Sequence, residues 1–449
     1  MRAGGTDVAS ARTWQMPLFR LSCCALALAA MFLTKGRTEL LAPIAVAVAL
    51  LISAGMALLR NTRLLTLPFL LLCLALTQCY DSYAVFVRYL PLVPAVLALW
   101  AIRLIRLRPR FRIGPSFWPL VAVAVATLVG GLGAISAAEY FRPTSLFYVF
   151  SLGPGLVLVY LWMKNEFVGE GDEKSFLADL SALAITAAIW TYAAHFSHFS
   201  DYLAGHKWVP PQWGNNVATM LLFSAPALLM RARENAWYFV PGVLVGAAAV
   251  VTESNAGMVL GILQLLLCFF CLWRSRASRA VRVISAVAFF GGLAGGIALL
   301  AYFLFGPELP LGMKYSIAAR VDLWQRGMAD FCENPAFGVG FGYLGNRDIY
   351  NGKIGTMNWY HLFLAQVMGG LGIAGVLAWG WQLAVRARIA LSQWGRDGFT
   401  PALCYAGLLM MTMINPGEFC PIPYAFVAVV LFVLMEDRGE HRSNALDIH

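Results

Sequence analysis

The sequence predicts an all-α, polytopic transmembrane bundle, and its composition and its apolar runs both indicate this class. Hydrophobic residues make up 60% of the 449 residues and charged residues only 12%, which is more apolar surface than a soluble chain of this size can bury. Apolar runs of about 18 residues or more, enough to cross a hydrocarbon core roughly 30 Å thick, recur from end to end. A transmembrane β-barrel would instead show short segments of alternating hydrophobicity.

The apolar runs predict about 12–14 spans in all. Fourteen can be placed, at 16–34, 40–59, 64–80, 86–102, 117–138, 144–163, 176–195, 215–230, 237–252, 254–273, 283–305, 360–383, 400–415 and 422–435. The adjoining spans 237–252 and 254–273 predict a helical hairpin with a tight turn near Glu253. We divide the chain into N-terminal membrane helices (1–195), a second membrane region (196–435) and a cytoplasmic tail (436–449).

The distribution of Lys and Arg predicts that both termini are cytoplasmic. With the N-terminus inside, most of the 33 basic residues fall in cytoplasmic segments, including 103–116 and 386–399. The net charge of +10 is thereby explained by topology and by contact with anionic membrane lipids, so we expect no nucleic-acid partner. Two longer segments, 196–214 and 306–359, are then placed on the outside.

The outer segment 306–359 contains the stretch "RVDLWQRGMADFCENPAFGVGFGYLG", residues 320–345. Its apolar residues Trp324, Gly327, Met328 and Phe331 recur at helical spacing, which predicts a short amphipathic helix lying at the outer interface. Arg320 continues the apolar stripe, whereas Arg326 lies off it and faces water or headgroups. A buried cation is costly unless it is paired, so Arg320 requires either a protein carboxylate or a bound anion.

Glycines and a histidine follow this predicted helix. Gly338 and Gly340 allow the backbone to approach a ligand closely and form an anion-binding nest, although a plain flexible loop fits the same pattern. His361 opens the span 360–383, where the positive end of the helix dipole favours a neutral imidazole that can accept a proton. The alternative is an interfacial histidine bonded to headgroups or backbone.

Together, "RVDLWQRGMADFCENPAFGVGFG" and His361 before "GGLGIAG" resemble the signature segment of the O-antigen ligase and polymerase family. Weaker similarities are "PPQWGNNVATMLL", "TESNAGMVLGIL" and "INPGEF", so that the likeness covers about residues 200–435. The chain departs from the family's pattern at Asn255, where Arg is usual, and at Leu362 and Phe363, where a polar residue such as Asn often follows the histidine.

The resemblance implies a membrane glycosyltransferase of cell-surface polysaccharide assembly, such as lipopolysaccharide, in the bacterial cytoplasmic membrane. Its donor would be a glycan linked to a polyprenyl diphosphate such as undecaprenyl diphosphate, and its acceptor a glycan or a lipid. The reaction would need no metal and no cofactor. Guanidinium groups suit the departing diphosphate because they are always charged and can bond two oxygens.

The resemblance also implies roles for individual residues. His361 would be the base or would orient the acceptor, and Arg320 would act on the diphosphate and in catalysis. Further diphosphate contacts would come from Arg88, Arg347, Gly338 and Gly340. Asp81 is the alternative partner of Arg88, and His206 and Glu253 are alternative bases.

Two other classes remain open. A polytopic transporter or a flippase for lipid-linked oligosaccharide would explain the spans and the intramembrane charges, and it predicts internal repeats with paired broken helices near the midplane. A non-catalytic scaffold for envelope assembly would explain all except the arrangement of Arg, Gly and His.

Overall fold

The chain folds into helices throughout the part that the computed structural model describes. That part comprises residues 7–35, 37–59, 61–78, 85, 88–89, 91–107, 112–134, 143–167, 170–204, 211–305, 311–341, 360–393 and 399–446, and it contains no β-strand. The all-α class predicted from the sequence is therefore confirmed.

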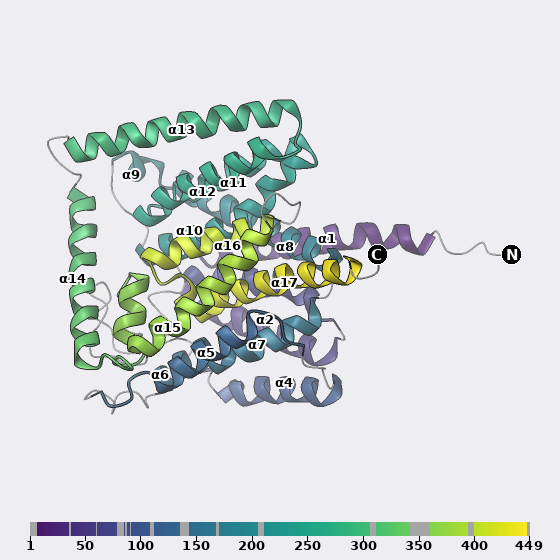
Figure 1. The fold of residues 1–449 in the computed structure, drawn as a ribbon. Coiled ribbons are helices and arrows are strands. Elements are labelled where there is room, and N and C mark those ends of the chain that lie inside the picture. The colour runs from purple at the N-terminus through teal and green to yellow at the C-terminus, as the bar shows by residue number, and fades with distance from the viewer. Residues whose placement is uncertain are drawn as a thin grey trace.

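The helices follow one another through short connections (Figure 1). They are α1 (Asp7–Leu33), α2 (Thr38–Leu58), α3 (Thr66–Leu76), α4 (Val93–Leu107), α5 (Phe117–Val129), α6 (Pro143–Leu152), α7 (Pro154–Glu166), α8 (Glu170–Phe196), α9 (Phe199–Leu203), α10 (Pro211–Leu229), α11 (Phe239–Ala248), α12 (Asn255–Arg274), α13 (Arg279–Phe305), α14 (Leu311–Glu333), α15 (Phe363–Ser392), α16 (Thr400–Ile414) and α17 (Phe426–Leu446).

Six helices of the described part are long and apolar enough to cross a membrane. They are Gln15–Leu33, Thr38–Leu58, Gly171–Phe196, Asn255–Arg274, Arg279–Ala298 and Phe363–Ser392. Four shorter apolar helices are Arg63–Leu76, Phe117–Val129, Ala236–Ala248 and Thr400–Ile414. The protein is therefore a membrane protein by the length and composition of its helices, and each of the fourteen expected spans overlaps a helix.

One expected span is interrupted. The segment 144–163 forms two helices, α6 and α7, which are separated at Gly153. Pro154 opens α7 because its ring has no N–H to donate and disfavours helical backbone at the preceding residue. The expected hairpin near Glu253 is present, since α11 and α12 pack together and the Ser254 hydroxyl caps α12 by accepting from the Gly257 N–H.

The sequence boundary at residue 195 does not separate two packing units. One cluster of buried apolar side chains runs from Met31 in α1 to Met435 in α17, because α8 packs on α10 and α7 packs on α17. Helices far apart in the sequence therefore share one core.

The expected tail 436–449 is also not a separate element, because α17 continues to Leu446. Glu436 is fully buried and accepts hydrogen bonds from the Tyr160 hydroxyl (2.7 Å) and from the Ser116 N–H (2.7 Å). Buried Lys164 lies 3.3 Å from Glu436 and 2.6 Å from Asp437. This network fixes the beginning of the predicted tail to α7, as expected for buried charges, which require partners.

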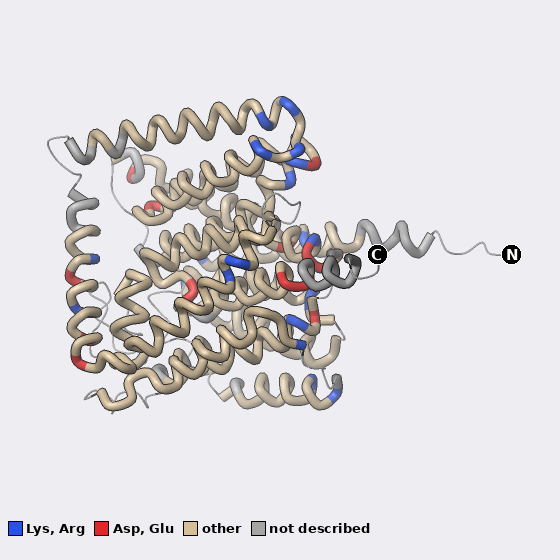
Figure 2. The backbone as a smooth tube through the Cα atoms, viewed as in Figure 1, with Lys and Arg blue, Asp and Glu red and all other residues tan. Residues whose placement is uncertain are grey.

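Basic residues gather at one end of the bundle. Figure 2 shows that most described Lys and Arg lie near the end where the two chain termini are found. At the opposite end, α14 lies across the direction of α13 and carries both acidic and basic residues (Figures 1 and 2). The two ends of the bundle therefore differ in charge and in architecture.

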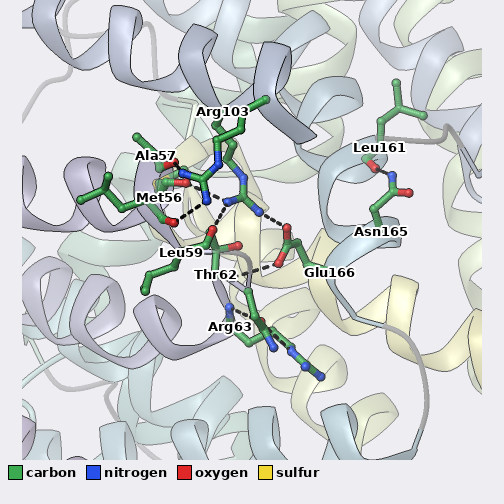
Figure 3. A network of polar contacts seen from close by, with 12 residues as sticks. Met56, Ala57, Leu59, Thr62, Arg63, Arg103, Leu161, Asn165 and Glu166 are labelled. Carbon is green, nitrogen blue, oxygen red and sulfur yellow. Dashed lines mark hydrogen bonds and ion pairs between the residues drawn. The ribbon is translucent and has the colours of Figure 1, made fainter. Parts of the chain in front are cut away.

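Several of these arginines stabilise helix ends in addition to marking a side of the membrane. Arg103 donates to the carbonyls of Met56 (2.7 Å) and Leu59 (2.8 Å), and Arg106 donates to those of Ala57 and Leu58 (Figure 3). These carbonyls end α2 and have no partner within the helix, so the two guanidinium groups serve as its cap.

Arg103 is itself buried and forms an ion pair with Glu166 at the end of α7. The other oxygen of Glu166 accepts from the Thr62 N–H at 2.9 Å (Figure 3). Arg103 was interpreted from the sequence as a topology signal alone, and the structure adds a packing role that links α2, α4 and α7.

Candidate functional site

His361 stands directly before α15, and its backbone is unusual. Its φ is +50°, and among the described residues only Glu253 shares a positive φ without being glycine. Such conformations cost energy and are maintained where the surroundings hold them, often at functional sites. Nδ1 of His361 lies 3.2 Å from Oδ1 of Asn415, the residue that ends α16.

This contact is a hydrogen bond in one tautomer of the imidazole. An amide oxygen only accepts, so in that tautomer Nδ1 of His361 carries the hydrogen and donates it to Asn415. Nε2 is then the ring nitrogen that can take a proton, which is the chemistry expected of a base. The sequence identified His361, but it gave no reason to pair it with Asn415, which lies 54 positions further along.

The turn after Asn415 holds a buried ion pair. Arg386 of α15 donates from Nη1 to Oε2 of Glu418 (2.5 Å) and to the Tyr405 hydroxyl (3.1 Å). Glu418 is 2% exposed and Arg386 is 3% exposed. The guanidinium also lies over the ring of Phe432, 4.9 Å from its centre.

The sequence predicted Arg386 in a cytoplasmic segment after the span 360–383; the structure instead buries Arg386 within α15, against Glu418 of the "INPGEF" turn. The expected span ended at 383, whereas α15 runs on to Ser392 and carries Arg386 inside the bundle. The signal that was missed is the continuous apolar pattern on both sides of Arg386. An ionisable residue within such a pattern is a candidate functional residue by itself.

A sharp break in α15 brings His361 and Arg386 to the same turn. Gly372 has φ +62° and ψ −155°, which is not helical. The rings of Phe363 and Trp379 lie 5.6 Å apart, although a straight helix would separate residues at this spacing by about 24 Å along its axis. The first piece of α15 therefore folds back on the second, and both pack against Phe419 of the turn.

The segment after α14 satisfies the backbone groups that this break leaves open. The N–H groups of Val339 and Gly340 donate to the carbonyls of Gly369 (2.9 Å) and Gly370 (2.8 Å). In return, the N–H groups that begin the second piece of α15 donate to the carbonyls of Pro335 and Ala336. A broken helix is tolerated at membrane depth only when its backbone is satisfied in this way.

The anion nest expected at Gly338 and Gly340 is therefore not formed. The N–H of Gly338 donates to the Asn334 carbonyl at 2.7 Å, and that of Gly340 donates to Gly370, so neither is available to a phosphate. Both glycines have positive φ, and they serve close packing instead. A Cβ at Gly338 would lie only 2.5 Å from the carbonyl oxygen of Gly369.

We expect Gly338→Ala to destabilise the protein more than Gly133→Ala. Both glycines have positive φ, so both changes carry a backbone cost of about 1–2 kcal/mol, but a Cβ at Gly133 meets nothing within 4 Å. The clash at Gly338 adds about 1–3 kcal/mol. Thermal unfolding of the two purified variants in detergent measures the difference, and equal losses would show that α15 yields to the new methyl group.

The helix expected around residues 320–331 is present but longer, as α14. Leu323 and Gly327 are its buried positions, and Gly327 packs on Tyr360 and Ala365 at the beginning of α15. Of the expected stripe, Gly327 is buried, whereas Trp324, Met328 and Phe331 are only half-buried, and the stripe did not include the buried Leu323.

The two arginines of α14, Arg320 and Arg326, also differ less in solvent exposure than expected. Arg320 lies seven residues before Gly327, which places it on the same face about 10 Å away, and it is half-buried. Arg326 pairs with Asp322 at 3.0 Å and is 38% exposed, so it too is only partly in solvent. The Tyr360 hydroxyl bonds to Asp330, which ties α14 to the residue before His361.

Arg88 has a protein partner. Its Nη2 lies 2.8 Å from Oε2 of Glu39 at the beginning of α2, and both side chains are largely exposed. The two alternatives for Arg88 were Asp81 and a diphosphate; the structure adds Glu39 as a partner and tests neither of them. Asp81, His206 and Arg347 lie outside the described residues.

Glu253, an alternative base, lies in the hairpin turn with φ +58°. Its Oε1 is 3.8 Å from Nε2 of His195, and Nδ1 of His195 lies 2.8 Å from the Thr191 carbonyl. Next to it, the Ser254 hydroxyl donates to Oδ1 of Asn215 at 2.5 Å. The expected Asn-containing entry to α10 and the hairpin turn thus meet in space.

No family model and no curated protein matches the chain. The site therefore rests on its geometry: His361 and Asn415 on one side of a four-residue turn, and Glu418 and Arg386 on the other. α14, with Arg320, covers the entrance to α15. Within the described residues, no group of three or more His, Cys, Asp or Glu side chains is arranged to hold a metal ion.

Proposed function

We propose that the chain transfers a glycan from a polyprenyl-diphosphate-linked donor to an acceptor hydroxyl at the outer face of the bacterial cytoplasmic membrane. In this proposal it is a metal-independent glycosyltransferase similar to O-antigen ligases and polymerases. Both termini are cytoplasmic, α14 is an amphipathic helix of the outer loop 306–359, and the membrane contains about 12–14 spans.

The observation that carries the proposal is the position of His361. It combines a positive φ, an Nδ1 contact to Asn415 that leaves Nε2 as the proton acceptor, and a place beside α14. Basic residues concentrate at the end where the termini lie, which supports a cytoplasmic assignment for that end (Figure 2). The α14 end then meets the leaflet that holds the lipid-linked donor.

The chemistry requires two groups at this end. The acceptor hydroxyl forms a new bond to the anomeric carbon and gives its proton to Nε2 of His361. The bond from that carbon to the diphosphate oxygen breaks, and the lipid diphosphate leaves with the electron pair. Arg320, on the face of α14 that contacts α15, stabilises the negative charge of this leaving group.

A reconstituted assay tests the proposed function. The purified protein in lipid vesicles should convert a polyprenyl-diphosphate-linked glycan and an acceptor into product and free lipid diphosphate, both measured by mass spectrometry. A strain without the gene should accumulate lipid-linked glycan, as long unligated chains for a ligase or as single repeat units for a polymerase. Absence of both turnover and accumulation would contradict the proposal.

The proposed orientation makes a separate prediction. A reporter tag in the segment 103–116 or 394–398 should be accessible only from the cytoplasm, because the proposed orientation places these Arg-containing segments inside. A tag at Asn351 should be accessible from outside. Cysteine labelling of intact cells with a membrane-impermeant reagent measures both, and protection at Asn351 would place His361 on the wrong leaflet for the donor.

A second candidate function is transport or flipping of a lipid-linked oligosaccharide. It is favoured by the break in α15 and by the buried Arg386–Glu418 pair, because discontinuous helices with paired charges are features of transporters. Vesicles that contain the protein and a fluorescent lipid-linked oligosaccharide distinguish the two functions. Translocation without release of lipid diphosphate would support the transporter.

A further inference from the structure

A row of buried polar side chains lies along one face of α15, beneath the turn that holds His361. Trp379, Gln382 and Arg386 are spaced by three and four residues, which places them on the same face of the helix. Each is at most 3% exposed. The Trp379 ring packs on Phe419 with centres 5.1 Å apart, and Arg386 bonds to Glu418, so the turn covers this row along its length.

Four polar atoms in this row have no hydrogen-bond partner within the part of the chain that the structure describes. They are Nε1 of Trp379, Oε1 of Gln382, Nε of Arg386 and Oε1 of Glu418. Each is shielded from solvent, and leaving such an atom unsatisfied in an apolar interior is costly. These four atoms lie together, three on one face of α15 and one on Glu418 of the turn that packs on it, whereas buried polar groups are generally hydrogen-bonded.

We propose that this row is a binding site for hydroxyl groups inside the membrane bundle. Two of the four atoms are N–H donors and two are oxygen acceptors. An anion would satisfy the donors but would be repelled by Glu418, and a cation would satisfy Glu418 but would be repelled by Arg386. Hydroxyl groups are neutral and both donate and accept, so two or more of them can bond the donors and the acceptors alike.

The hydroxyl groups belong either to buried water or to a carbohydrate. Buried water normally bridges polar groups that lack protein partners, and carbohydrate bound beside Trp379 and Phe419 would offer the same chemistry with an apolar ring face against the aromatic rings. The row contacts the turn at Glu418, whereas His361 contacts it at Asn415. It does not depend on the proposed glycan transfer, and its test uses no lipid-linked donor.

The first test compares two tryptophans. Trp379→Phe and Trp190→Phe remove the same indole N–H and the same volume. Trp190 is also buried, packed on Phe32, and its Nε1 also has no partner within the described residues, but it does not belong to the row on α15. If Trp379 binds a hydroxyl group, Trp379→Phe lowers the Tm of the purified full-length protein more than Trp190→Phe does. Gln382→Leu then also lowers the Tm, because it deletes a bonded oxygen.

The opposite result in these Tm measurements would overturn the proposal. An acceptor that truly lacks a partner stabilises the protein when it is replaced by an apolar group of similar shape. A Tm that rises in Gln382→Leu, together with equal effects at Trp379 and Trp190, would therefore show that the row is dry and empty.

The second test labels the wild-type protein with hydroxyl radicals, generated from water by a short X-ray pulse and followed by mass spectrometry of the two tryptophans. Trp379 should be modified more than Trp190, although both are buried to the same degree. Equal labelling would again overturn the proposal. A mixture of glucose, galactose, mannose and N-acetylglucosamine distinguishes the sources: loss of labelling at Trp379 assigns the site to carbohydrate, and unchanged labelling assigns it to water.

Discussion

Arg386→Met is expected to lower the free energy of unfolding by about 3–5 kcal/mol, because it leaves Glu418 as a buried charge without its partner. Glu418 is 2% exposed, and the Arg386 guanidinium lies 2.5 Å from its carboxylate. The loss is measured by unfolding the purified protein in mixed micelles with increasing denaturing detergent.

The matched variant for this prediction removes both charges. Arg386→Met combined with Glu418→Leu should recover most of the stability, because replacing a buried pair by apolar side chains is often neutral or stabilising. If the double variant is as unstable as Arg386→Met alone, the pair is a packing element whose shape, rather than its charge, holds α15 to the turn.

Arg320→Lys is expected to reduce glycan transfer by 10²–10³-fold, or about 2.7–4 kcal/mol of transition-state stabilisation. A lysine keeps the positive charge, but its ammonium cannot reproduce the two parallel bonds that a guanidinium makes to phosphate oxygens. The measurement is transfer in vitro from a purified lipid-linked donor, with the amount of each variant in the membrane determined by immunoblot.

Arg326→Lys is the control on the same helix. Arg326 is partly exposed and pairs with Asp322 one turn away, and such surface pairs contribute only about 0–1 kcal/mol. Its activity and abundance should be close to those of the wild type. Equal activity of the two variants, or a loss at Arg320 that only follows lost protein, would make Arg320 a structural residue and place the diphosphate site elsewhere.

The helix positions could be predicted from the sequence because apolar length is a local property. Each expected span overlaps a helix, and the turn at Glu253 was found from the contact of two apolar runs. Breaks were harder to place. Pro154 splits one span, and its effect on the preceding Gly153 can be predicted from the sequence. The reversal at Gly372 cannot, because it depends on the segment 335–340, which bonds to the backbone groups left without helical partners.

The site was predictable only in part, because local patterns in the sequence do not show which distant segments will meet. His361 and the helix of Arg320 were identified from local pattern and family resemblance. The partners were not, since Asn415 meets His361, Glu39 meets Arg88 and Glu418 meets Arg386 only after distant helices pack. The expected nest at Gly338 and Gly340 is not formed because the Gly338 N–H bonds to nearby Asn334 and the Gly340 N–H bonds to distant Gly370.

The sequence by itself therefore determined that this is an all-α membrane protein, because the hydrophobic effect acts on the composition and length of each run separately. Only the tertiary structure decided which polar groups meet inside it. In a low-dielectric interior, a buried charge or an open backbone group is tolerated solely when a partner reaches it. That partner comes from elsewhere in the chain, as Glu418 does for Arg386, and no local pattern specifies it.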